Sequence, residues 1–405
     1  MTKPMEGVRV LEVALYAFVP AAGAVLAEWG ADVIKVEHPL RPDPMRGTAA
    51  WDIEPGTGGY TYMWEVANRG KRGIAVDIAT PEGRELVLQL AEQADVFLTN
   101  FLTEARQKLG IDVEDVMERN PRIVYARGSG QGPCGPDAQL GGFDGLTYWS
   151  RAGIAASLTP VGAAHPVRMV GPGFGDVQAG MTLAGGVGAA LYQRERTGTG
   201  SVVDVSLLST GMWAMQPTMV ASSLTGVDVL PIPAHDTIGN PLVNVYRTAD
   251  GRHLTLGMLE SDRYWPGFCE VTDKADLVSD PRFCDAAARA DNRELLTAIL
   301  DELFDSFTLE EWQELLGRQE GPWTVLQYPG EVAHDPQAEA NGYVQDVEYG
   351  EGRTLRLVSA PVQFDGRPGA LTPAPEHGAH TEMVLLEMGY DWDQIGCFKD
   401  AGVVN

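Results

Sequence analysis

The chain has 405 residues, of which 44% are hydrophobic and 21% are charged. This composition is typical of a soluble globular protein with two or three domains, and it excludes a disordered chain. The 30 basic and 56 acidic residues give a net charge of −26, which argues against nucleic acid or an anionic membrane surface as a partner. Residues 1–127 carry only −5 of this charge, and residues 128–405 carry −21. An anionic ligand is therefore expected on the N-terminal third.

No targeting or membrane segment is predicted. The first ten residues lack the apolar core of a signal peptide. The longest uncharged stretch, Val205–Val227, contains Pro217 and several Ser, Thr and Gln residues, which favours a buried helix over a membrane span. The four cysteines show no C-x-x-C spacing, so neither zinc nor a disulfide framework is expected, and a reducing cytoplasm is the expected compartment.

The first 130 residues alternate between strand and helix patterns. Strands are predicted over 8–13, 32–37, 74–77, 95–98 and 123–126, and helices over 20–29, 81–91, 104–109 and just before Asn120. This alternation predicts a parallel sheet covered on both faces, in the doubly wound α/β style. No G-x-G-x-x-G follows the first strand, so a dinucleotide site of the usual kind is not expected.

The character of the chain changes near residue 228. Before it, a Gly/Ala-rich helix is predicted over 176–194, whose glycines indicate close packing against another backbone, and a strand over 201–208. After it come a hairpin over 243–258 and helices over 291–304 and 309–316. We therefore expect a large domain of residues 1–227 and 336–405, with a smaller α+β domain of residues 228–335 between its two parts.

The histidines show no metal-ligand spacing. His377 and His380 lie three residues apart without further ligands nearby, and the expected structure there is a solvated loop before a helix. No G-x-S-x-G is present, which argues against an α/β-hydrolase, and no G-x-x-x-x-G-K-[ST] is present, which argues against a P-loop enzyme.

Asp176 stands between a Gly-rich turn and the long apolar helix. The residues alone favour a role as helix N-cap, because Asp is a preferred capping residue. The alternative is a functional carboxylate that the glycines expose in a cleft. In that case the helix N-terminus would keep Asp176 ionised and would offer N–H groups to a developing oxyanion.

Two further motifs have a structural and a functional interpretation. Asp144, in Gly141-Gly142-Phe143-Asp144-Gly145, is expected to cap a helix over 145–151. The basic run of residues 69–72 (RGKR) is either a solvated turn or a phosphate contact on the least acidic third of the chain.

Several segments occur in an order that resembles a known family. They include VRVLEV and GADVIKVEHP near the start, then ANRGKRGIAVD, PEGRELVLQLAEQADVFLTNF, GGFDG, GFGDVQAGM, YRTADGRHLTL and HGAHTEMVL. The sequence is similar to the class III CoA-transferases, a family that also contains formyl-CoA transferase, carnitine CoA-transferase and α-methylacyl-CoA racemase. The resemblance extends over almost the whole chain. It implies a Rossmann-like large domain with an inserted small domain, in a homodimer whose two chains interlock like linked rings.

The resemblance also implies a chemistry. Asp176 occupies the position of the family's nucleophilic aspartate, which forms an anhydride with the acyl group and then an aspartyl-CoA thioester. The implied substrates are an acyl-CoA donor and a free carboxylic acid acceptor, without a metal, nucleic acid or membrane insertion.

The CoA-binding positions carry over one by one. Asn100 and Phe101 match the family's Asn-Phe pair, and Val76 matches the hydrophobic residue beside the adenine. Lys108 and His38 stand where arginines are usual, so each could meet a phosphate but without a bidentate guanidinium. Phe143 and Asp144 are also assigned to the site, as is Ala17.

Three departures narrow the function. Ala17 stands where formyl-CoA transferase has a glutamine that is useful in catalysis. The run of four glycines that covers that enzyme's active site is absent at residues 238–242. Both departures argue against formate or oxalate as substrate. Phe143 stands where the racemases have an acid/base histidine. CoA transfer is therefore favoured over the alternatives, which are an α-methylacyl-CoA racemase or epimerase and a catalytically silent CoA-binding protein.

Overall fold

The computed structural model describes residues 3–51, 61–350 and 352–405. The chain divides into two compact units, a larger one of Met1–Leu230 with Asp335–Asn405 and a smaller one of Pro231–His334. The larger unit contains β1 (Arg9–Val13), α1 (Phe18–Glu28), β2 (Asp32–Glu37), η1 (Pro44–Trp51), α2 (Tyr62–Asn68), β3 (Arg72–Ala75), α3 (Pro81–Glu92), β4 (Val96–Thr99), α4 (Thr103–Leu109), α5 (Val113–Arg119), β5 (Val124–Ser129), η2 (Gly145–Arg151), α6 (Ile154–Leu158), α7 (Phe174–Thr197), β6 (Ser201–Ser206), α8 (Leu207–Ala214), α9 (Gln216–Thr225), α15 (Pro336–Ala340), β10 (Val344–Glu348), β11 (Thr354–Val358), α16 (Thr381–Glu387) and α17 (Trp392–Asp400).

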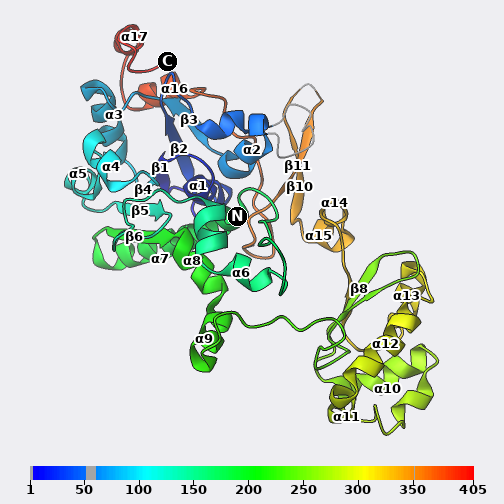
Figure 1. The fold of residues 1–405 in the computed structure, drawn as a ribbon. Coiled ribbons are helices and arrows are strands. Elements are labelled where there is room, and N and C mark those ends of the chain that lie inside the picture. The colour runs from blue at the N-terminus through cyan, green and yellow to red at the C-terminus, as the bar shows by residue number, and fades with distance from the viewer. Residues whose placement is uncertain (1–2, 52–60, 351) are drawn as a thin grey trace. The chain divides into compact units, whose positions relative to one another are not determined.

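A six-stranded parallel sheet organises the larger unit (Figure 1). Its strand order is β3-β2-β1-β4-β5-β6, and the register places Leu11 of β1 between Ile34 of β2 and Phe97 of β4. This confirms the predicted parallel α/β sheet. The direction of the strand order reverses between β1 and β4, and ligands of such sheets bind at the carboxyl ends of the strands at this reversal.

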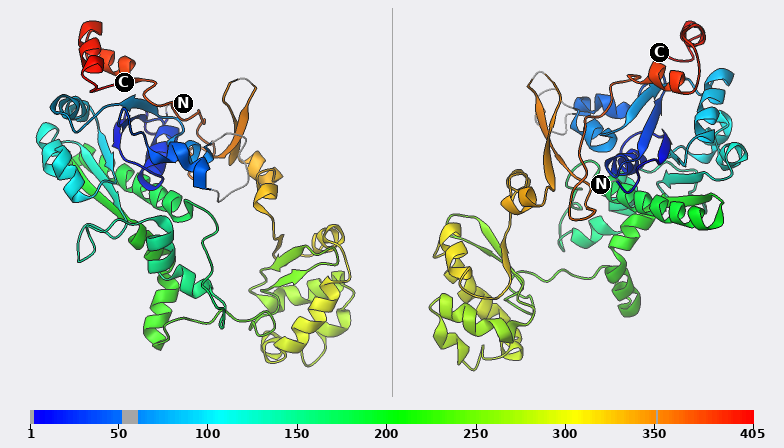
Figure 2. Two further views of the ribbon diagram at one scale, coloured as in Figure 1. Left: turned by 45° about the horizontal axis from the view of Figure 1, so that its top comes forward. Right: turned by 180° about the vertical axis from the view of Figure 1, so that it is seen from behind.

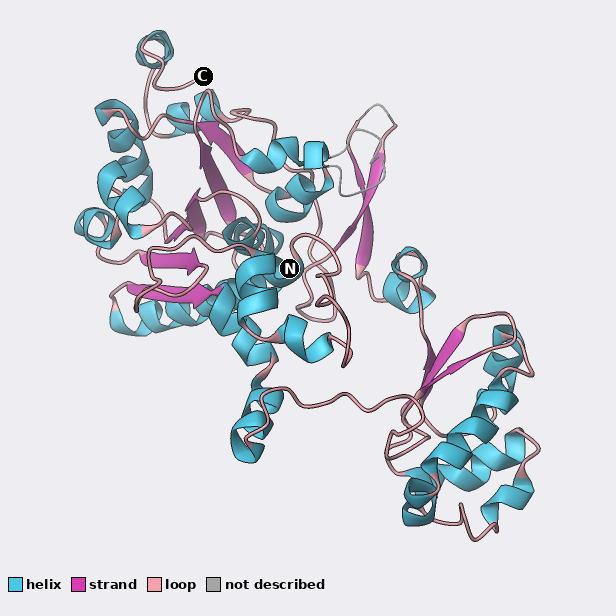
Figure 3. Cartoon of the chain, viewed as in Figure 1, coloured by secondary structure: helices cyan, strands magenta, loops and turns pink. Residues whose placement is uncertain are grey.

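Helices cover both faces of the sheet (Figure 3). Because successive side chains of a strand point to opposite faces, Val10 packs into one core with α1 and α7, and Leu11 packs into a second core with α3 and α5. Helices α1 and α7 approach closely at Gly180, where an added Cβ would lie 2.8 Å from the Phe18 carbonyl oxygen and from Ala21. The predicted role of glycine in close packing is confirmed at this position.

The C-terminal segment covers the β3 edge of the sheet, and Figure 2 shows α16 beside that edge in both views. The Nδ1 atom of His380 accepts a hydrogen bond from the Gly73 N–H at 3.1 Å, and Thr381 Oγ1 accepts one from the Ala75 N–H at 3.1 Å. The expected solvated loop at His377 and His380 is therefore wrong, because this segment satisfies backbone donors of the edge strand.

The uncharged stretch Val205–Val227 is not one buried helix. It contains the end of β6 and two helices, α8 and α9. No residue of α9 is buried, and Trp213 and Leu224 are 75% and 82% exposed. Among the described residues no helix is long and apolar enough to cross a membrane.

The smaller unit has its own core. Its three strands form an antiparallel sheet in the order β7-β8-β9 (Figure 3), and Phe304 stacks on Trp312 inside it, with ring centroids 4.2 Å apart. Its elements are β7 (Val245–Arg247), β8 (His253–Leu256), α10 (Ser261–Val271), η3 (Ala275–Val278), α11 (Ala286–Asp291), α12 (Arg293–Phe304), α13 (Leu309–Leu316), β9 (Trp323–Val325) and α14 (Pro329–Val332).

A cluster of buried charges joins β1, β2 and the turn before β3. Lys35 Nζ lies 3.1 Å from Glu12 and 3.0 Å from Asp43, and Lys71 Nζ lies 2.7 Å from Glu12, with all four side chains fully shielded from solvent. Burial lowers the pKa of Lys71 to about 7, although Glu12 acts in the opposite direction. Gly23 of α1 leaves room for the Glu12 carboxylate, since an added Cβ would lie 2.0 Å from Oε2. A buried charge is costly without an oppositely charged partner, so this cluster fixes how β1, β2 and the turn before β3 pack together.

Replacement of Glu12 by alanine is expected to destabilise the protein strongly. The change leaves Lys71 buried without its carboxylate partner, and breaking a buried pair costs about 3–5 kcal/mol. The matched control is Glu92→Ala, which removes an exposed ion pair with Arg119 and should cost about 0–1 kcal/mol. Urea unfolding followed by circular dichroism measures both losses, and equal losses would contradict the structural role of the cluster.

Candidate functional site

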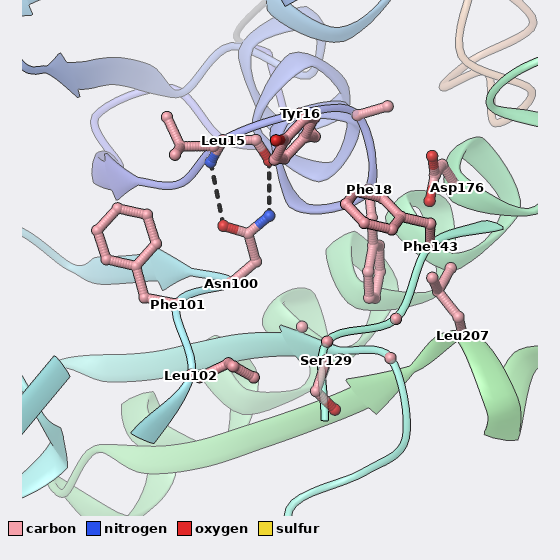
Figure 4. A pocket seen from close by; sticks show the side chains of 15 residues that line it. Leu15, Tyr16, Phe18, Asn100, Phe101, Leu102, Ser129, Phe143, Asp176 and Leu207 are labelled. Atoms are coloured by element: carbon pink, nitrogen blue, oxygen red, sulfur yellow. Dashed lines mark hydrogen bonds between the residues drawn. The ribbon is translucent and has the colours of Figure 1, made fainter. Parts of the chain in front are cut away.

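A pocket of about 190 Å³ lies at the reversal of the strand order (Figure 4). The loops after β1, β4 and β5 form it together with the Gly141–Gly142 segment and the start of α7. In Figure 4 Asp176 lies toward one end of the pocket, and Asn100 and Phe101 lie toward the other. The lining residues are Leu15, Tyr16, Ala17, Phe18, Asn100, Phe101, Leu102, Gly128, Ser129, Gly130, Gly141, Gly142, Phe143, Asp176 and Leu207.

The Asn100 side chain ties together the loops after β1 and β4. Its Oδ1 accepts a hydrogen bond from the Leu15 N–H at 3.0 Å, and its Nδ2 donates one to the Leu15 carbonyl at 2.6 Å (Figure 4). This two-point contact satisfies both backbone groups of Leu15. Asn100 therefore supports one wall of the pocket, and Phe101 lines it beside Asn100.

Tyr16 adopts a backbone conformation that is unusual for a residue other than glycine. Its φ is +63°, and its N–H donates to Asp43 Oδ1 at 3.1 Å. The left-handed region costs an L-residue about 1–2 kcal/mol. The hydrogen bond to Asp43, which belongs to the buried charge cluster, stabilises this turn against that cost. The Tyr16 ring meets Phe143 edge to face, with centroids 5.4 Å apart.

Two glycines let the loop after β5 approach the loop before η2. A Cβ on Gly130 would lie 2.5 Å from the Gly142 Cα, and a Cβ on Gly142 would lie 2.6 Å from the Gly130 Cα. Neither position can accept a side chain without moving backbone. The glycine-rich runs of the sequence thus serve to close the pocket.

Asp176 does not cap its own helix. It is the third residue of α7, whose N-cap position is Gly173, and the cap has no side-chain hydrogen bond. Asp176 is half-buried and lines the pocket. Burial, followed by the charge of Asp144, raises the pKa of Asp176 to about 7. The capping interpretation is therefore wrong. Desolvation and the like charge of Asp144 act against the expected ionisation of Asp176 by the helix N-terminus.

Asp144 does not cap the helix that follows it. The start of η2 has no side-chain cap, and both Asp144 carboxylate oxygens instead accept from the Gly175 N–H of α7, at 3.0 and 3.1 Å. The sequence expectation is corrected, because this carboxylate occupies a different helix terminus. The Gly175 N–H is consequently not available to a developing oxyanion.

The pocket brings together five of the nine residues that the sequence assigned to the site, namely Ala17, Asn100, Phe101, Phe143 and Asp176. Asp144 lies behind the lining, bound to α7. Val76 is buried in the second core, where it pairs with Val404. His38 and Lys108 lie outside the lining of this pocket.

Most cations of the N-terminal third are used inside the fold. Lys71 belongs to the buried cluster, and Arg72 pairs with Asp32 at 2.5 Å and with Glu387 at 2.8 Å. Arg69 pairs with Glu28 at 3.2 Å. The basic run of residues 69–72 is therefore structural, and the expectation of a phosphate contact there is wrong. Arg106 is likewise buried, and it pairs with Asp112 at 2.8 Å.

Lys108 and Arg84 are among the cations of this region that form no ion pair with a described residue. Lys108 is exposed and makes no ion pair with a described residue. His38 is half-buried: its Nδ1 accepts from the Leu40 N–H at 3.0 Å, and its Nε2 lies 2.8 Å from the Arg41 guanidinium and 3.7 Å from Asp77. No sequence pattern distinguishes Arg84, whose buried Nε has no hydrogen-bond partner among the described residues. Gly110, two residues after Lys108, leaves room for this guanidinium, because an added Cβ would lie 3.0 Å from Arg84 Nε.

The pocket is suited to carboxylate chemistry. Its lining is mostly apolar, and Asp176 is its ionisable group apart from the Tyr16 phenol. Among the described residues no group of three or more His, Cys, Asp or Glu side chains could hold a metal ion. A desolvated carboxylate beside an apolar wall is more basic than one in water, and such a group can attack an activated carbonyl carbon.

Comparisons with known proteins identify the family. The profile of CoA-transferase family III matches residues 5–381. The chain is 32% identical to (R)-2-hydroxy-4-methylpentanoate CoA-transferase of Clostridioides difficile, over 99% of both chains. It is 29% identical to human succinyl-CoA:glutarate CoA-transferase, over 100% of this chain and 90% of the relative.

The fold agrees with a solved structure. A CAIB/BAIF family protein from Brucella suis superimposes with a TM-score of 0.81 at 26% identity, over 96% of this chain and 100% of the other. Sequence and fold therefore agree over nearly the whole length, and the chain belongs to the class III CoA-transferase family.

Proposed function

We propose that this protein transfers CoA from an acyl-CoA donor to a free carboxylic acid through covalent intermediates on Asp176. The observation that carries the proposal is the placement of Asp176, which is half-buried in the pocket at the reversal of the strand order and makes no capping hydrogen bond. This is the environment of a basic, unengaged nucleophile.

The reaction proceeds in four balanced steps. The Asp176 carboxylate attacks the donor thioester carbonyl, which gives an acyl-aspartyl anhydride and expels CoA thiolate. The thiolate attacks the aspartyl carbonyl, which releases the donor acid and leaves an aspartyl-CoA thioester. The acceptor carboxylate attacks that thioester, which forms the second anhydride and expels the thiolate again. The thiolate then attacks the acceptor acyl carbon, which gives the new acyl-CoA and restores Asp176. The thioester bond energy is retained throughout.

A racemase or epimerase of the same family is the alternative. Racemisation at the α-carbon needs an acid/base group on each face of the substrate. Phe143 lines the pocket and contacts Tyr16 edge to face, and a phenyl ring exchanges no proton. A catalytically silent CoA-binding protein is disfavoured, because such a protein has no need for a desolvated carboxylate in the pocket.

The pocket favours an apolar acyl group. Its described lining contains no Lys, Arg or His, so a second carboxylate on the substrate would meet only Asp176, with Asp144 close behind it. Like charges in a partly desolvated site repel strongly. We therefore infer that the acceptor is a monocarboxylic acid with a branched or aromatic side chain rather than a dicarboxylic acid such as oxalate or glutarate.

We assign the CoA phosphates to Lys108, Arg84 and His38. A protein with a net charge of −26 attracts a multiply charged anion only where cations gather. Lys108 lies on α4 two residues before Gly110, which packs against Arg84 of α3, and His38 follows β2. In this arrangement the pantetheine arm passes Asn100 and Phe101 and brings the thioester to Asp176.

A second copy of the chain completes the proposed enzyme. A hollow of about 440 Å³ in the larger unit is lined by apolar side chains that include Val25, Met181 and Trp213. Helix α9, which follows α8 in the chain, buries none of its residues. Exposed apolar surface of this extent is typical of an interface, and the family resemblance supports an interlocked homodimer.

Acyl transfer through Asp176 is expected to move oxygen from the acceptor acid into the protein. With an acceptor labelled with ¹⁸O in both carboxyl oxygens, the second anhydride step leaves one ¹⁸O atom on Asp176, because the thiolate cleaves the acyl side. Mass spectrometry of the peptide that contains Asp176 measures this label. Phenylacetate and 4-methylpentanoate are suitable acceptors, and glutarate should be a poor one.

The control is Asp176→Ala, which should remain folded and lose exchange. The isosteric Asp393→Asn, at an exposed position of α17, should keep full exchange and full labelling. Exchange without label on Asp176, or substantial turnover by Asp176→Ala, would overturn the covalent mechanism.

No rapid exchange of the α-proton is expected, because Phe143 supplies neither an acid nor a base. A 2-methylacyl-CoA incubated with the enzyme in heavy water, without acceptor acid, should take up deuterium no faster than in the Asp176→Ala variant. Proton NMR of the α-position follows the uptake. Uptake faster than CoA transfer would make the racemase the better assignment.

CoA affinity is expected to fall as ionic strength rises, since partly exposed phosphate contacts are screened by salt. Lys108→Ala should weaken binding roughly two- to fivefold at low salt, the range for an exposed ion pair, and should flatten the salt dependence. Lys3→Ala, which removes another exposed lysine of the N-terminal third, is the control. Isothermal titration at several salt concentrations measures both, and identical curves for Lys108→Ala and wild type would show that Lys108 is no phosphate partner.

A further inference from the structure

The start of α7 lacks a cap from its own segment. Its N-cap residue is Gly173, with φ +80°, and no neighbouring side chain accepts from the first turn. The first N–H groups of a helix need an external acceptor when they are buried. Both carboxylate oxygens of Asp144 meet this need at the Gly175 N–H, at 3.0 and 3.1 Å, although Asp144 lies 31 residues earlier in the chain.

The segment around Asp144 is fitted closely to this turn. Asp144 is only 6% exposed. A Cβ on Gly175 would lie 2.5 Å from Asp144 Oδ1 and 2.2 Å from Tyr148 Cγ, so position 175 admits no side chain without rearrangement. One turn further along α7, the Tyr148 hydroxyl donates to Gln178 Oε1 at 2.9 Å. Two contacts therefore fix the first two turns of α7 against residues 144–148.

Asp176 follows Gly175 directly, so the anchor acts on its backbone. Asp144, just before η2, is the charged group that raises the pKa of Asp176 after burial. The titratable side chains of the adjacent elements are the Tyr16 phenol in the pocket lining and the Tyr148 phenol of η2, which bonds Gln178 of α7. Among the described lining residues no cation offsets the two carboxylates. The charge of Asp144 therefore adds to burial in raising the pKa of Asp176, and burial also raises the pKa of Asp144 itself.

We infer that Asp144 is a positioning residue for the proposed nucleophile. It anchors the first turn of α7 with a carboxylate supplied from another loop, and so sets both the direction and the electrostatic environment of Asp176. The inference rests on the proposed covalent role of Asp176 for its consequence in catalysis, but the anchor itself can be tested without turnover.

The electrostatic part has a defined sign. The nucleophile is the ionised carboxylate, and burial together with Asp144 raises the pKa of Asp176 to about 7. Activity should therefore rise with pH as Asp176 loses its proton near neutrality. Removing the Asp144 charge lowers the pKa of Asp176, so the acid limb of the pH profile should move to lower pH.

Two variants separate the anchor from the charge. Asp144→Asn keeps an oxygen that can accept from Gly175 but removes the charge, so its acid limb in kcat/KM should shift down by on the order of one pH unit, with KM for the acyl-CoA donor near that of wild type. Asp144→Ala removes the anchor as well, and kcat should fall at least about tenfold, because small misplacements of a reacting group are costly. Asp393→Asn, exposed on α17, is the control.

A second measurement does not depend on turnover. In protein labelled with ¹³C at the aspartate carboxyl carbon, the Asp176 resonance is assigned by its loss in Asp176→Asn. Its titration midpoint should lie near neutrality in wild type and lower in Asp144→Asn. An unchanged midpoint together with an unchanged pH profile would overturn the inference, as would wild-type kcat in a folded Asp144→Ala.

The two failures are distinguishable. If wild type exchanges no acyl group, the proposed function fails, while the carboxyl titration still decides whether Asp144 acts on Asp176. If Asp144→Ala does not fold, the pH profile and the titration of Asp144→Asn decide alone.

Discussion

A buried cluster of charges beneath the central strand determines where the pocket forms. Glu12 on β1 bonds Lys35 on β2 and Lys71 before β3, and Asp43 completes the group. Each of these ions would be costly to bury without its partners, so the strands and the connecting loops have one arrangement. Asp43 also accepts from the Tyr16 N–H. The turn after β1, which forms one wall of the pocket, is thus held by Asp43 at Tyr16 and by the Asn100 side chain at Leu15.

The opposite wall depends on a carboxylate that serves another element. Asp144 satisfies the start of α7 at Gly175, and the same charge makes the neighbouring Asp176 harder to ionise. A helix N-terminus ordinarily favours negative charge, but here one carboxylate already occupies that terminus. Asp176 faces an apolar pocket instead. Asp144 therefore stabilises the helix start and, after burial, also contributes to the raised pKa of the proposed nucleophile.

The distribution of charge constrains the ligand as much as the pocket does. The N-terminal third has fewer free cations than its composition indicates, because Lys71, Arg72 and Arg106 are committed to internal carboxylates. Exposed Lys108 and half-buried Arg84, which packs against Gly110, are among the cations that form no ion pair with a described residue. An acidic protein repels a polyanion except where cations gather, and this is the reason for our proposal that Lys108 and Arg84 meet the CoA phosphates.

The sequence by itself determined the parallel sheet, most of its strands and helices, and the family, because hydrophobic periodicity and ordered motifs are local properties of the chain. It also singled out Asp176, Asn100, Phe101, Phe143 and Ala17, which line one pocket. Only the tertiary structure decided what Asp144 and the cations do, since a charged side chain can pair with any group that folding brings near it. The Asp144 bond to Gly175 spans 31 residues, and the Arg72 pair with Glu387 spans 315. No local pattern encodes such partners, because burial and neighbouring charge exist only after the chain has folded.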